Sequence, residues 1–527
     1  MLANIIGERP SIGFLVEANE LVGYGHASRL SSLQLTFLEI YSPIYVISNK
    51  FSKPYLVNFF SEKCNLHFIN EIFFNDESIK SIKNLVKSLE IKILLVDSYK
   101  LLKGHEEALK KIVFLVVVDD HLLTHNADVV INQRVGLAIK QSDEIKNIWL
   151  TGAEYSLVSS VKSKNLEVSA PKKVLIHFGG SGKYSTLENF FAAVIEASIA
   201  ANMEIYAIVP NQKSEEELIK LLEFLLLQAE DIIFLPKTLN LRNEFYKYDI
   251  VAGPAGTSTF EALMSKSVVF SAQISDDGRD DLNSWLGLGH LLHFSHGEAK
   301  SKDLIQISFQ YLLDNYEQFF NLLERGRSLL DGNGPRNAVR DILRSYKGEK
   351  FLPESNSQYT GFNFSPCDIT DARNFLNSRN LDINLIVSRS SHRRISWQEH
   401  IVWWTNNNIA KFKLVIDESV ELYGWIKIIS LGSKYFFTSG WFPSRKEKSK
   451  NAIKEAFLIM DGMIDFIRNT GLSGTWVVTL KKDNTFAYML NKKFGLKENI
   501  DKKIILNLDK LYPNTKLSDV RVMKLDF

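Results

Sequence analysis

Short apolar runs alternate with longer amphipathic segments over the first quarter of the chain. The apolar runs are nearly continuous, as in buried parallel strands, and cover residues 11–16, 43–48, 91–97 and 112–119. Between them, residues 78–89 and 105–111 have the spacing of amphipathic helices. This alternation predicts a doubly wound α/β lobe, whose ligands collect at the carboxyl ends of its strands.

The end of the first predicted strand carries two glycines and a histidine. Gly23 and Gly25 allow positive φ and a close approach to a ligand, and a helix predicted to begin near His26 directs its first N–H groups there. His26 is therefore a candidate general base or phosphate contact, although a histidine at a helix start beside a tight turn is the alternative. Later strand ends carry further polar residues, each of which could be a site residue or a plain cap: Asp97, Tyr99, Asp119 and Asp120.

A second α/β lobe is predicted after the polar stretch 161–171. A strand over residues 173–178 runs into a glycine-rich turn, and a helix follows from about residue 185. Gly180 and Ser181 make this turn a candidate phosphate cradle, although such turns also occur without a ligand. Residues 205–209 and 232–235 continue the strand pattern.

A stronger phosphate-binding signal lies in residues 248–263, where a strand leads into a turn of small residues and then a helix. The first N–H groups of that helix can hold a diphosphate, and the carboxylate of Glu261 can bind two ribose hydroxyls. The predicted diphosphate contacts are Ala255, Gly256, Thr257, Ser258 and Thr259. A strand over 267–271, a polar loop containing Asp277 and helical segments up to Lys347 follow.

A third domain is predicted beyond residues 349–364, which are rich in Ser, Asn, Pro and Gly and are expected to form a linker. Its predicted helices lie near 372–376 and 450–468, and its predicted strands cover 411–416, 421–431, 435–438 and 475–479, so we expect a mixed α+β domain. Aromatic residues at 397–404 have helical spacing, which favours a hydrophobic face over an acceptor pocket. The predicted division is 1–160, 161–348, the linker 349–364, and 365–527.

Composition narrows the class of protein. At 527 residues the chain is too long for one domain with a single hydrophobic core. A content of 45% hydrophobic and 24% charged residues is typical of soluble globular proteins. The 63 basic and 61 acidic residues nearly cancel, so no global charge favours nucleic acid or an acidic membrane. Cys64 and Cys367 lack a metal-type spacing, which favours a reducing compartment and argues against structural zinc. No apolar stretch approaches the roughly 20 residues that cross a bilayer, so we expect a cytoplasmic protein.

Six segments, taken in their order and spacing, carry a resemblance to a known family. They are residues 23–29, 97–99, 119–120, 127–132, 178–181 and 255–262. Over residues 11–343 the chain resembles the UDP-sugar hydrolases of pseudaminic acid biosynthesis, which release UDP from a 2,4-diacetamido-2,4,6-trideoxyhexose. The resemblance implies two Rossmann-like lobes in a glycosyltransferase-B-like arrangement.

The resemblance also implies a role for each matching residue. His26 would activate water for attack at the anomeric carbon without a metal, and Asp97 and Tyr99 would line the sugar side of the site. Residues 255–259 would hold the diphosphate, whose developing charge faces a helix N-terminus, and Glu261 would hold the ribose. Asp277 lies in a loop where the family usually has an Asn-Gln pair, and it would act as an alternative base or repel a diphosphate.

The third domain carries two further segments of this kind. Trp397-x-x-His400 and the pattern from Asn484 to Leu496 resemble GNAT-type N-acetyltransferases, in particular those that act on amino sugars in the same pathway. The resemblance implies acetyl-CoA as a co-substrate. Asn491 stands where the family usually has a tyrosine, and residues 445–452 lack the glycines that usually hold the pyrophosphate. The candidate acetyl-CoA contacts are Arg445, Lys446, Lys448 and Asn484.

Together these features predict a bifunctional enzyme that acetylates a UDP-linked amino sugar in its third domain and releases UDP in the first two. A glycosyltransferase with Asp277 or Asp97 as base is one alternative, and a non-catalytic sugar-nucleotide binder is another. We expect a UDP-amino-sugar as substrate, no metal or cofactor for the hydrolase, and neither nucleic acid nor a membrane span.

Overall fold

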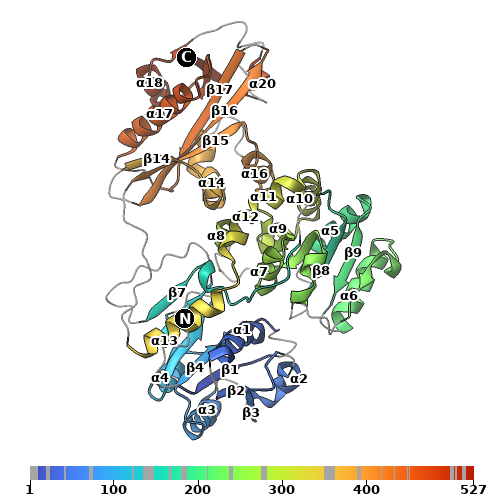
Figure 1. The fold of residues 1–527 in the computed structure, drawn as a ribbon. Helices are drawn as coiled ribbons and strands as arrows, with labels where there is room; N and C mark the ends of the chain where they lie inside the picture. Colours follow the sequence, from blue (N-terminus) through green and yellow to red (C-terminus); the bar gives the residue numbers. More distant parts are fainter. Residues whose placement is uncertain are drawn as a thin grey trace. The chain divides into compact units, whose positions relative to one another are not determined.

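The computed structural model describes residues 10–18, 24–40, 43–57, 59–70, 75–120, 124–133, 147–164, 169–179, 187–209, 212–236, 241–274, 282–348, 362–387, 393–416, 418–432, 434–447, 449, 451–498, 504, 507–512 and 518–527. The chain forms two compact units, Met1–Ser355 and Asn356–Phe527, and each has its own sheets and core (Figure 1).

The first sheet of unit 1 has seven parallel strands in the order β3-β2-β1-β4-β5-β6-β7. They are β1 Ile12–Val16, β2 Ile44–Asn49, β3 Asn65–Ile69, β4 Ile93–Asp97, β5 Phe114–Val118, β6 Val129–Asn132 and β7 Ile148–Thr151. The connecting helices are α1 Gly25–Ile40, α2 Lys53–Leu56, α3 Asp76–Ser88 and α4 Lys103–Lys110. The four strands and two helices predicted for this lobe are confirmed. Because β1 pairs with β4, Val16 lies opposite Asp97 at the carboxyl edge.

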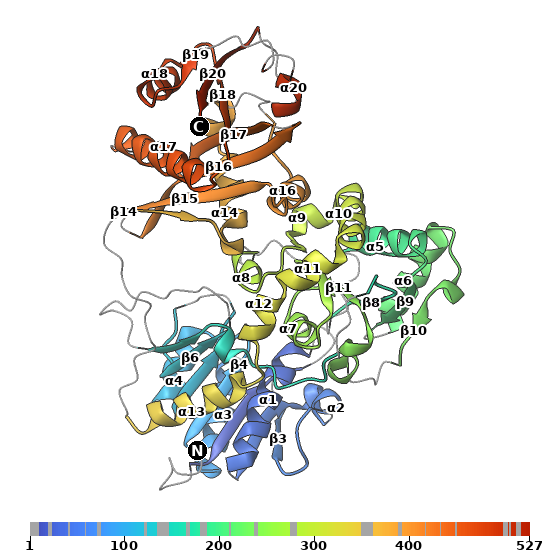
Figure 2. The ribbon, with the colours of Figure 1, turned by 45° about the horizontal axis from the view of Figure 1, so that its top comes forward.

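Helices cover both faces of this sheet because neighbouring residues of each buried strand point to opposite sides. Phe14 and Leu95 pack with α1, whereas Leu15 and Leu94 pack with α3 and α4. Residues of α13 (Gly334–Tyr346) join the first of these cores, although they lie in the range predicted for the second lobe. Figure 2 shows α13 beside α1.

The second sheet of unit 1 has six parallel strands in the order β10-β9-β8-β11-β12-β13. They are β8 Lys173–His177, β9 Glu204–Ile208, β10 Ile233–Phe234, β11 Ile250–Pro254, β12 Val268–Ala272 and β13 His293–Phe294. The helices are α5 Glu188–Ala200, α6 Gln212–Phe224, α7 Thr257–Met264, α8 Leu282–Gly287, α9 His296–Ala299, α10 Lys302–Asp314, α11 Tyr316–Leu322 and α12 Glu324–Leu329. The five strands predicted here are confirmed, and unit 1 therefore holds two Rossmann-like sheets.

Unit 2 is a mixed sheet of seven strands in the order β14-β15-β16-β17-β18-β20-β19. They are β14 Phe362–Pro366, β15 Ile409–Ile416, β16 Ser419–Leu431, β17 Lys434–Pro443, β18 Gly474–Lys481, β19 Lys497–Glu498 and β20 Val520–Asp526. The helices are α14 Ala372–Arg379, α15 Asp382–Val387, α16 Trp397–Trp404, α17 Ala452–Asn469, α18 Thr485–Lys493 and α20 Leu508–Leu511. The predicted α+β sheet is confirmed, but β14 begins inside the range expected for a linker.

The faces of the unit 2 sheet are covered by different helices. Leu422 and Ile426 point to α17, whereas Tyr423, between them in β16, packs against Phe375 of α14. His400 of α16 is buried beside Phe375, and burial lowers its pKa to about 3. The aromatic segment of α16 is thus a core face, as the helical spacing favoured.

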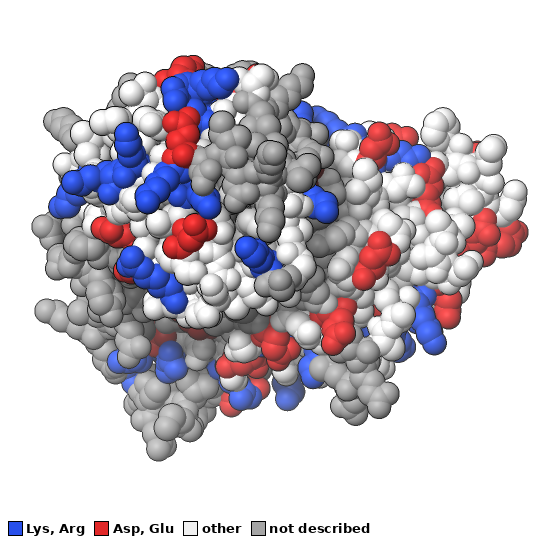
Figure 3. Space-filling view, turned by 90° about the horizontal axis from the view of Figure 1, so that it is seen from above, with Lys and Arg blue, Asp and Glu red and all other residues white. Residues whose placement is uncertain are grey.

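The surface and the helices add two further observations. In the part of the chain that the structure describes, no helix combines the length and apolarity needed to span a bilayer. Figure 3 shows both basic and acidic side chains on the described part of one face, in keeping with the nearly balanced charges of the sequence.

Candidate active site

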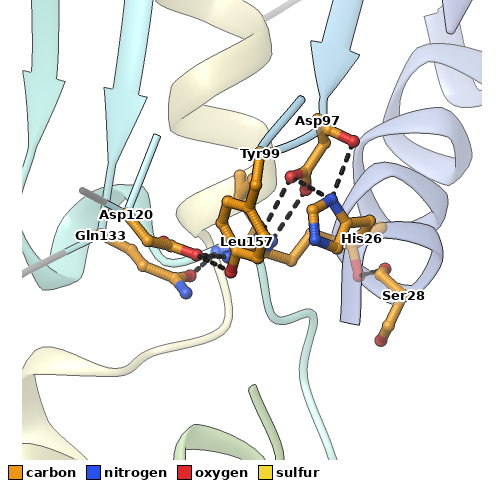
Figure 4. A network of polar contacts seen from close by, with 9 residues as sticks. His26, Ser28, Asp97, Tyr99, Asp120, Gln133 and Leu157 are labelled. Atoms are coloured by element: carbon orange, nitrogen blue, oxygen red, sulfur yellow. Dashed lines mark hydrogen bonds and ion pairs between the residues drawn. The ribbon is translucent and has the colours of Figure 1, made fainter. Parts of the chain in front are cut away.

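The carboxyl ends of β1, β4 and β5 bring a set of polar side chains together (Figure 4). His26 is the second residue of α1, Asp97 ends β4, and Asp120 follows β5 by two residues. His26 and Arg29 share a face of α1 because residues three apart on a helix are neighbours. The cluster consists of His26, Arg29, Asp97, Tyr99 and Asp120.

His26 and Asp97 form a buried pair. The Nδ1 atom of His26 lies 2.8 Å from the Asp97 Oδ1 atom and 2.8 Å from its backbone oxygen. Its Nε2 atom is buried and has no hydrogen-bond partner among the described residues. Burial acts to lower the pKa of His26, but the Asp97 carboxylate outweighs it and raises the pKa. A histidine whose Nδ1–H donates to a carboxylate has Nε2 free to accept a proton.

Arg29 neutralises the acids beside this histidine. Its Nε and Nη2 atoms donate to the two Asp97 carboxylate oxygens at 2.8 Å each, and Nη1 pairs with Asp120. Such bidentate, charge-assisted bonds are among the strongest in proteins. Burial opposes ionisation of Asp97, yet Arg29 and His26 together lower its pKa to about 2. Asp97 is therefore an anion at every physiological pH.

Tyr99 is the exposed member of the cluster. Its side chain is 53% exposed, its hydroxyl donates to Asp120 at 3.1 Å, and its ring meets the His26 ring edge to face at 4.6 Å between centroids. Tyr99 thus lies over the buried His26 and borders solvent.

The predicted phosphate-binding turns of the second lobe lie on neighbouring strands. A side chain at Gly253 would collide with the His177 backbone oxygen at 2.3 Å, so this glycine lets the end of β11 approach β8 closely. Gly179, with φ of 66°, follows β8 beside Pro254. Gly179, the last described residue after β8, therefore lies beside the end of β11, the strand that precedes α7.

The start of α7 has the features of an anion site. The Thr259 hydroxyl caps the helix by accepting from the Gly256 N–H at 3.2 Å, and no acid occupies the first turn. The N–H groups of Thr257 and Ser258 have no intrahelical acceptor, so they are available to a ligand. A side chain at Gly25 or Gly256 would meet no described atom within 4 Å, so both glycines face open space. Helices α1 and α7 contact each other.

Glu261 lies one turn into α7 and is only 9% exposed. Burial raises the pKa of its carboxyl to about 7, although Arg242 opposes this shift. Near neutral pH this carboxyl is therefore readily protonated, and hydrogen-bond donors placed beside it would favour its charged form.

Glu261→Gln is expected to stabilise unit 1 and to weaken UDP binding. The pKa of Glu261 in the folded protein lies above its unfolded value, so ionisation of Glu261 destabilises the folded protein fully above about pH 7 and not at all below about pH 4. At pH 8 the substitution should therefore raise the free energy of unfolding by about 1–3 kcal/mol. UDP affinity should fall about tenfold because a charged acceptor is lost. Thermal unfolding at pH 5 and pH 8 and calorimetric UDP titration measure both effects. Equal UDP affinity in the two proteins would contradict the role of Glu261.

Five of the predicted site residues lie outside the described residues: Gly23, Gly180, Ser181, Asp277 and Lys448. Conversely, Arg29 belonged to a recognised motif but was not predicted as a site residue, and Asp120 was predicted only as either a site residue or a cap. Glu17 was not predicted either. It follows β1, is buried, and its carboxylate accepts two hydrogen bonds from Lys100 at 2.9 and 3.1 Å. The available signal was position, because all three lie at or next to a strand end or the first helical turn.

The two cysteines have unreactive surroundings. Burial raises the pKa of the Cys64 thiol to about 11 and raises that of Cys367 as well. Within the described ranges, no group of three or more His, Cys, Asp and Glu side chains is placed to hold a metal ion.

Unit 2 contains a second candidate site where β17 and β18 separate. These parallel strands pair only from Tyr435 to Thr438 and from Gly474 to Val477, although both continue beyond. Three buried polar atoms near these elements have no hydrogen-bond partner among the described residues: Thr438 Oγ1, Thr479 Oγ1 and Asn491 Oδ1.

Two of the predicted acetyl-CoA contacts, Arg445 and Asn484, have partners within unit 2. Arg445 is paired with Glu421 and, at 2.8 Å, with Glu455 of the first turn of α17. Asn484 caps α18 by accepting from the Ala487 N–H at 3.0 Å. Lys446, the next residue after Arg445, is exposed. Of these basic side chains, Arg445 is therefore the one that acids of unit 2 neutralise.

Several solved structures match about two thirds of the chain at low sequence identity. No protein-family model and no curated protein matches the sequence. The S. aureus MnaA–UDP co-structure is similar, with 14% identity, a TM-score of 0.49 and coverage of 66% of this chain and 100% of that chain. A putative UDP-N-acetylglucosamine 2-epimerase from Listeria monocytogenes has 14% identity, a TM-score of 0.48 and the same coverage. A glycosyltransferase from Rickettsia africae has 13% identity, a TM-score of 0.45 and coverage of 65% and 100%. The likeness is one of fold.

Proposed function

We propose that unit 1 hydrolyses a UDP-sugar at its anomeric carbon, with a 2,4-diacetamido-2,4,6-trideoxyhexose as the sugar, in a glycosyltransferase-B-like arrangement. The observation that carries the proposal is the buried His26–Asp97 pair, whose outer nitrogen has no partner within the described ranges, on a helix that contacts α7. The motifs of residues 11–343 that resemble UDP-sugar hydrolases support it.

In the proposed reaction, neutral His26 accepts a proton at Nε2 from water as the water oxygen attacks the anomeric carbon. The bond between that carbon and the UDP oxygen breaks, and UDP leaves as an anion. Asp97 stabilises the imidazolium that forms, as in other His–Asp pairs. The N–H groups at the start of α7 stabilise the charge that develops on the leaving phosphate.

UDP release from UDP-2,4-diacetamido-2,4,6-trideoxy-altrose by the purified chain, in water without an acceptor and with EDTA, tests this function. Steady release is expected. Release that begins only when an alcohol acceptor is added would establish a glycosyltransferase instead. Tight binding without release under either condition would establish a binding protein.

For unit 2 we propose a GNAT-like fold, supported by the divergence of β17 from β18 and by the segments at Trp397 and Asn484. The residues at the start of α17 do not fit a CoA pyrophosphate. Glu455 is buried there and accepts from Arg445 and from the Ser449 hydroxyl, so a carboxylate holds the position that a phosphate would need. Acetyl-CoA binding is therefore expected to be weak.

Glu455→Gln is expected to tighten acetyl-CoA binding by about 5- to 30-fold. The substitution removes a buried negative charge, whose interaction with the helix N-terminus is worth up to about 2 kcal/mol, and it breaks the pair with Arg445. Equilibrium dialysis with labelled acetyl-CoA measures the change. The control is Asp461→Asn, an exposed acid in the middle of the same helix. Equal affinity in the wild type and Glu455→Gln would show that Glu455 does not oppose the pyrophosphate.

A further inference from the structure

A second buried ionic cluster lies beside the active-site cluster in the first lobe. The Nδ1 atom of His125 lies 2.6 Å from a Glu106 carboxylate oxygen, and its Nε2 atom lies 3.3 Å from the Asp119 Oδ2 atom. Glu106 projects from α4, whereas Asp119 directly follows β5. His125 therefore links a helix to the strand end that carries part of the active site.

The cluster is built to hold a charged histidine. The three side chains are no more than 6% exposed, and the second Glu106 oxygen accepts the N–H of Asn126. Burial acts to lower the pKa of His125, but its bonds to Asp119 and Glu106 raise it to about 9. A buried cation held between two acids fixes their positions, since neither acid can move without exposing an unpaired charge.

One peptide unit joins this cluster to the active site. The Asp119 carboxylate forms an ion pair with His125, and the Asp119 backbone N–H donates to the Ile131 backbone oxygen at 3.0 Å. The next residue, Asp120, accepts from Arg29 and from the Tyr99 hydroxyl. The positions of Arg29 and Tyr99, which contact Asp97 and His26, therefore depend on where Asp119 is held.

We propose that His125 is a positioning residue of the active site, which acts through Asp119 to hold Asp120 against Arg29 and Tyr99. The proposal deepens the proposed hydrolase function and rests on it for any effect on rate. One consequence can be measured without turnover. When Asp120 is displaced, the positive charge of Arg29 is less compensated and disfavours the protonated form of His26.

His125→Gln and Glu106→Gln in the full chain test the proposal. His26 should titrate at a lower pH in both variants, because the less compensated Arg29 disfavours the imidazolium; NMR titration of the histidines measures this shift. UDP release should fall by roughly 10- to 100-fold in kcat, the cost of misplacing reacting groups by about 1 Å. Lys110→Met is the matched control. It breaks another link between α4 and this segment, the pair of Lys110 with Asp128 at 2.9 Å, without touching Asp119.

Lys110→Met is expected to unfold at a lower temperature while its His26 titration stays unchanged. The same result in His125→Gln and Glu106→Gln would overturn the proposal. If His125→Gln does not fold, Glu106→Gln provides the test. In the wild type, His125 should be doubly protonated at pH 8, and a neutral ring there would also overturn it. If the wild-type chain releases no UDP, the hydrolase proposal fails, whereas the His26 titration still decides the role of His125.

Discussion

Replacing His26 with alanine is expected to lower the kcat for UDP release by about 10²- to 10⁴-fold, the usual contribution of a positioned general base. The reason is geometric: Asp97 holds the Nδ1 side of the ring, and Nε2 is the buried nitrogen left to accept a proton. UDP affinity should change little, because the predicted diphosphate and ribose contacts lie on α7. Measuring kcat for release and the Kd for UDP separates the two.

The pH dependence of the same reaction gives a second check on His26. The base must be neutral, so kcat should rise with pH until it passes the folded-state pKa. Because Asp97 raises that pKa, the rise should lie above the ordinary histidine value near 6.5. His67→Ala, in the edge strand β3, is the control and should keep the wild-type rate. Unchanged turnover in His26→Ala would remove His26 from the mechanism.

The strands of unit 1 were largely predictable because parallel strands buried on both faces read as unbroken apolar runs, as in Ile93–Asp97. β3 was not, because it lies at the sheet edge and is mostly half-exposed, with His67 inside it. β20 was missed as well: its basic residues Arg521 and Lys524 interrupt the apolar pattern, although it pairs with β18 along its whole length. Pairing with a distant strand leaves no local signal.

The candidate site was predictable in its positions but not in its partners. Sequence order placed His26, Asp97 and Tyr99 at strand ends, which a parallel sheet brings to one edge. It could not show that Arg29 would neutralise both Asp97 and Asp120, since those contacts join residues 68 and 91 positions apart. The basic segment at Arg445 also could not show that Arg445 would pair with Glu455, ten residues further along the chain.

Replacing Arg29 with methionine is expected to destabilise unit 1 by about 3–5 kcal/mol, the usual cost of leaving buried charges without their partner. Arg29 is buried and bonds to Asp97 and Asp120; among the described side chains, His26 would still pair with Asp97 and Tyr99 with Asp120. The two units need not unfold together, so the measurement must report on unit 1 alone. Hydrogen exchange of peptides covering β1 and β4 gives its free energy of opening.

The loss in Arg29→Met should also depend on pH in a defined direction. In the wild type the pKa of Asp97 is about 2, so its stabilising contribution is complete above the unfolded value near 3.9 and is lost only as the pH falls towards 2. Without Arg29, burial raises the pKa of Asp97, and protonation relieves part of the cost in mild acid. The destabilisation should therefore be smaller at pH 5 than at pH 7. Arg336→Met is the matched control, because its pair with Glu39 at 3.1 Å is more than half exposed and should contribute under about 1 kcal/mol at either pH. A loss in Arg29→Met that equals the control would show that the buried acids find other partners.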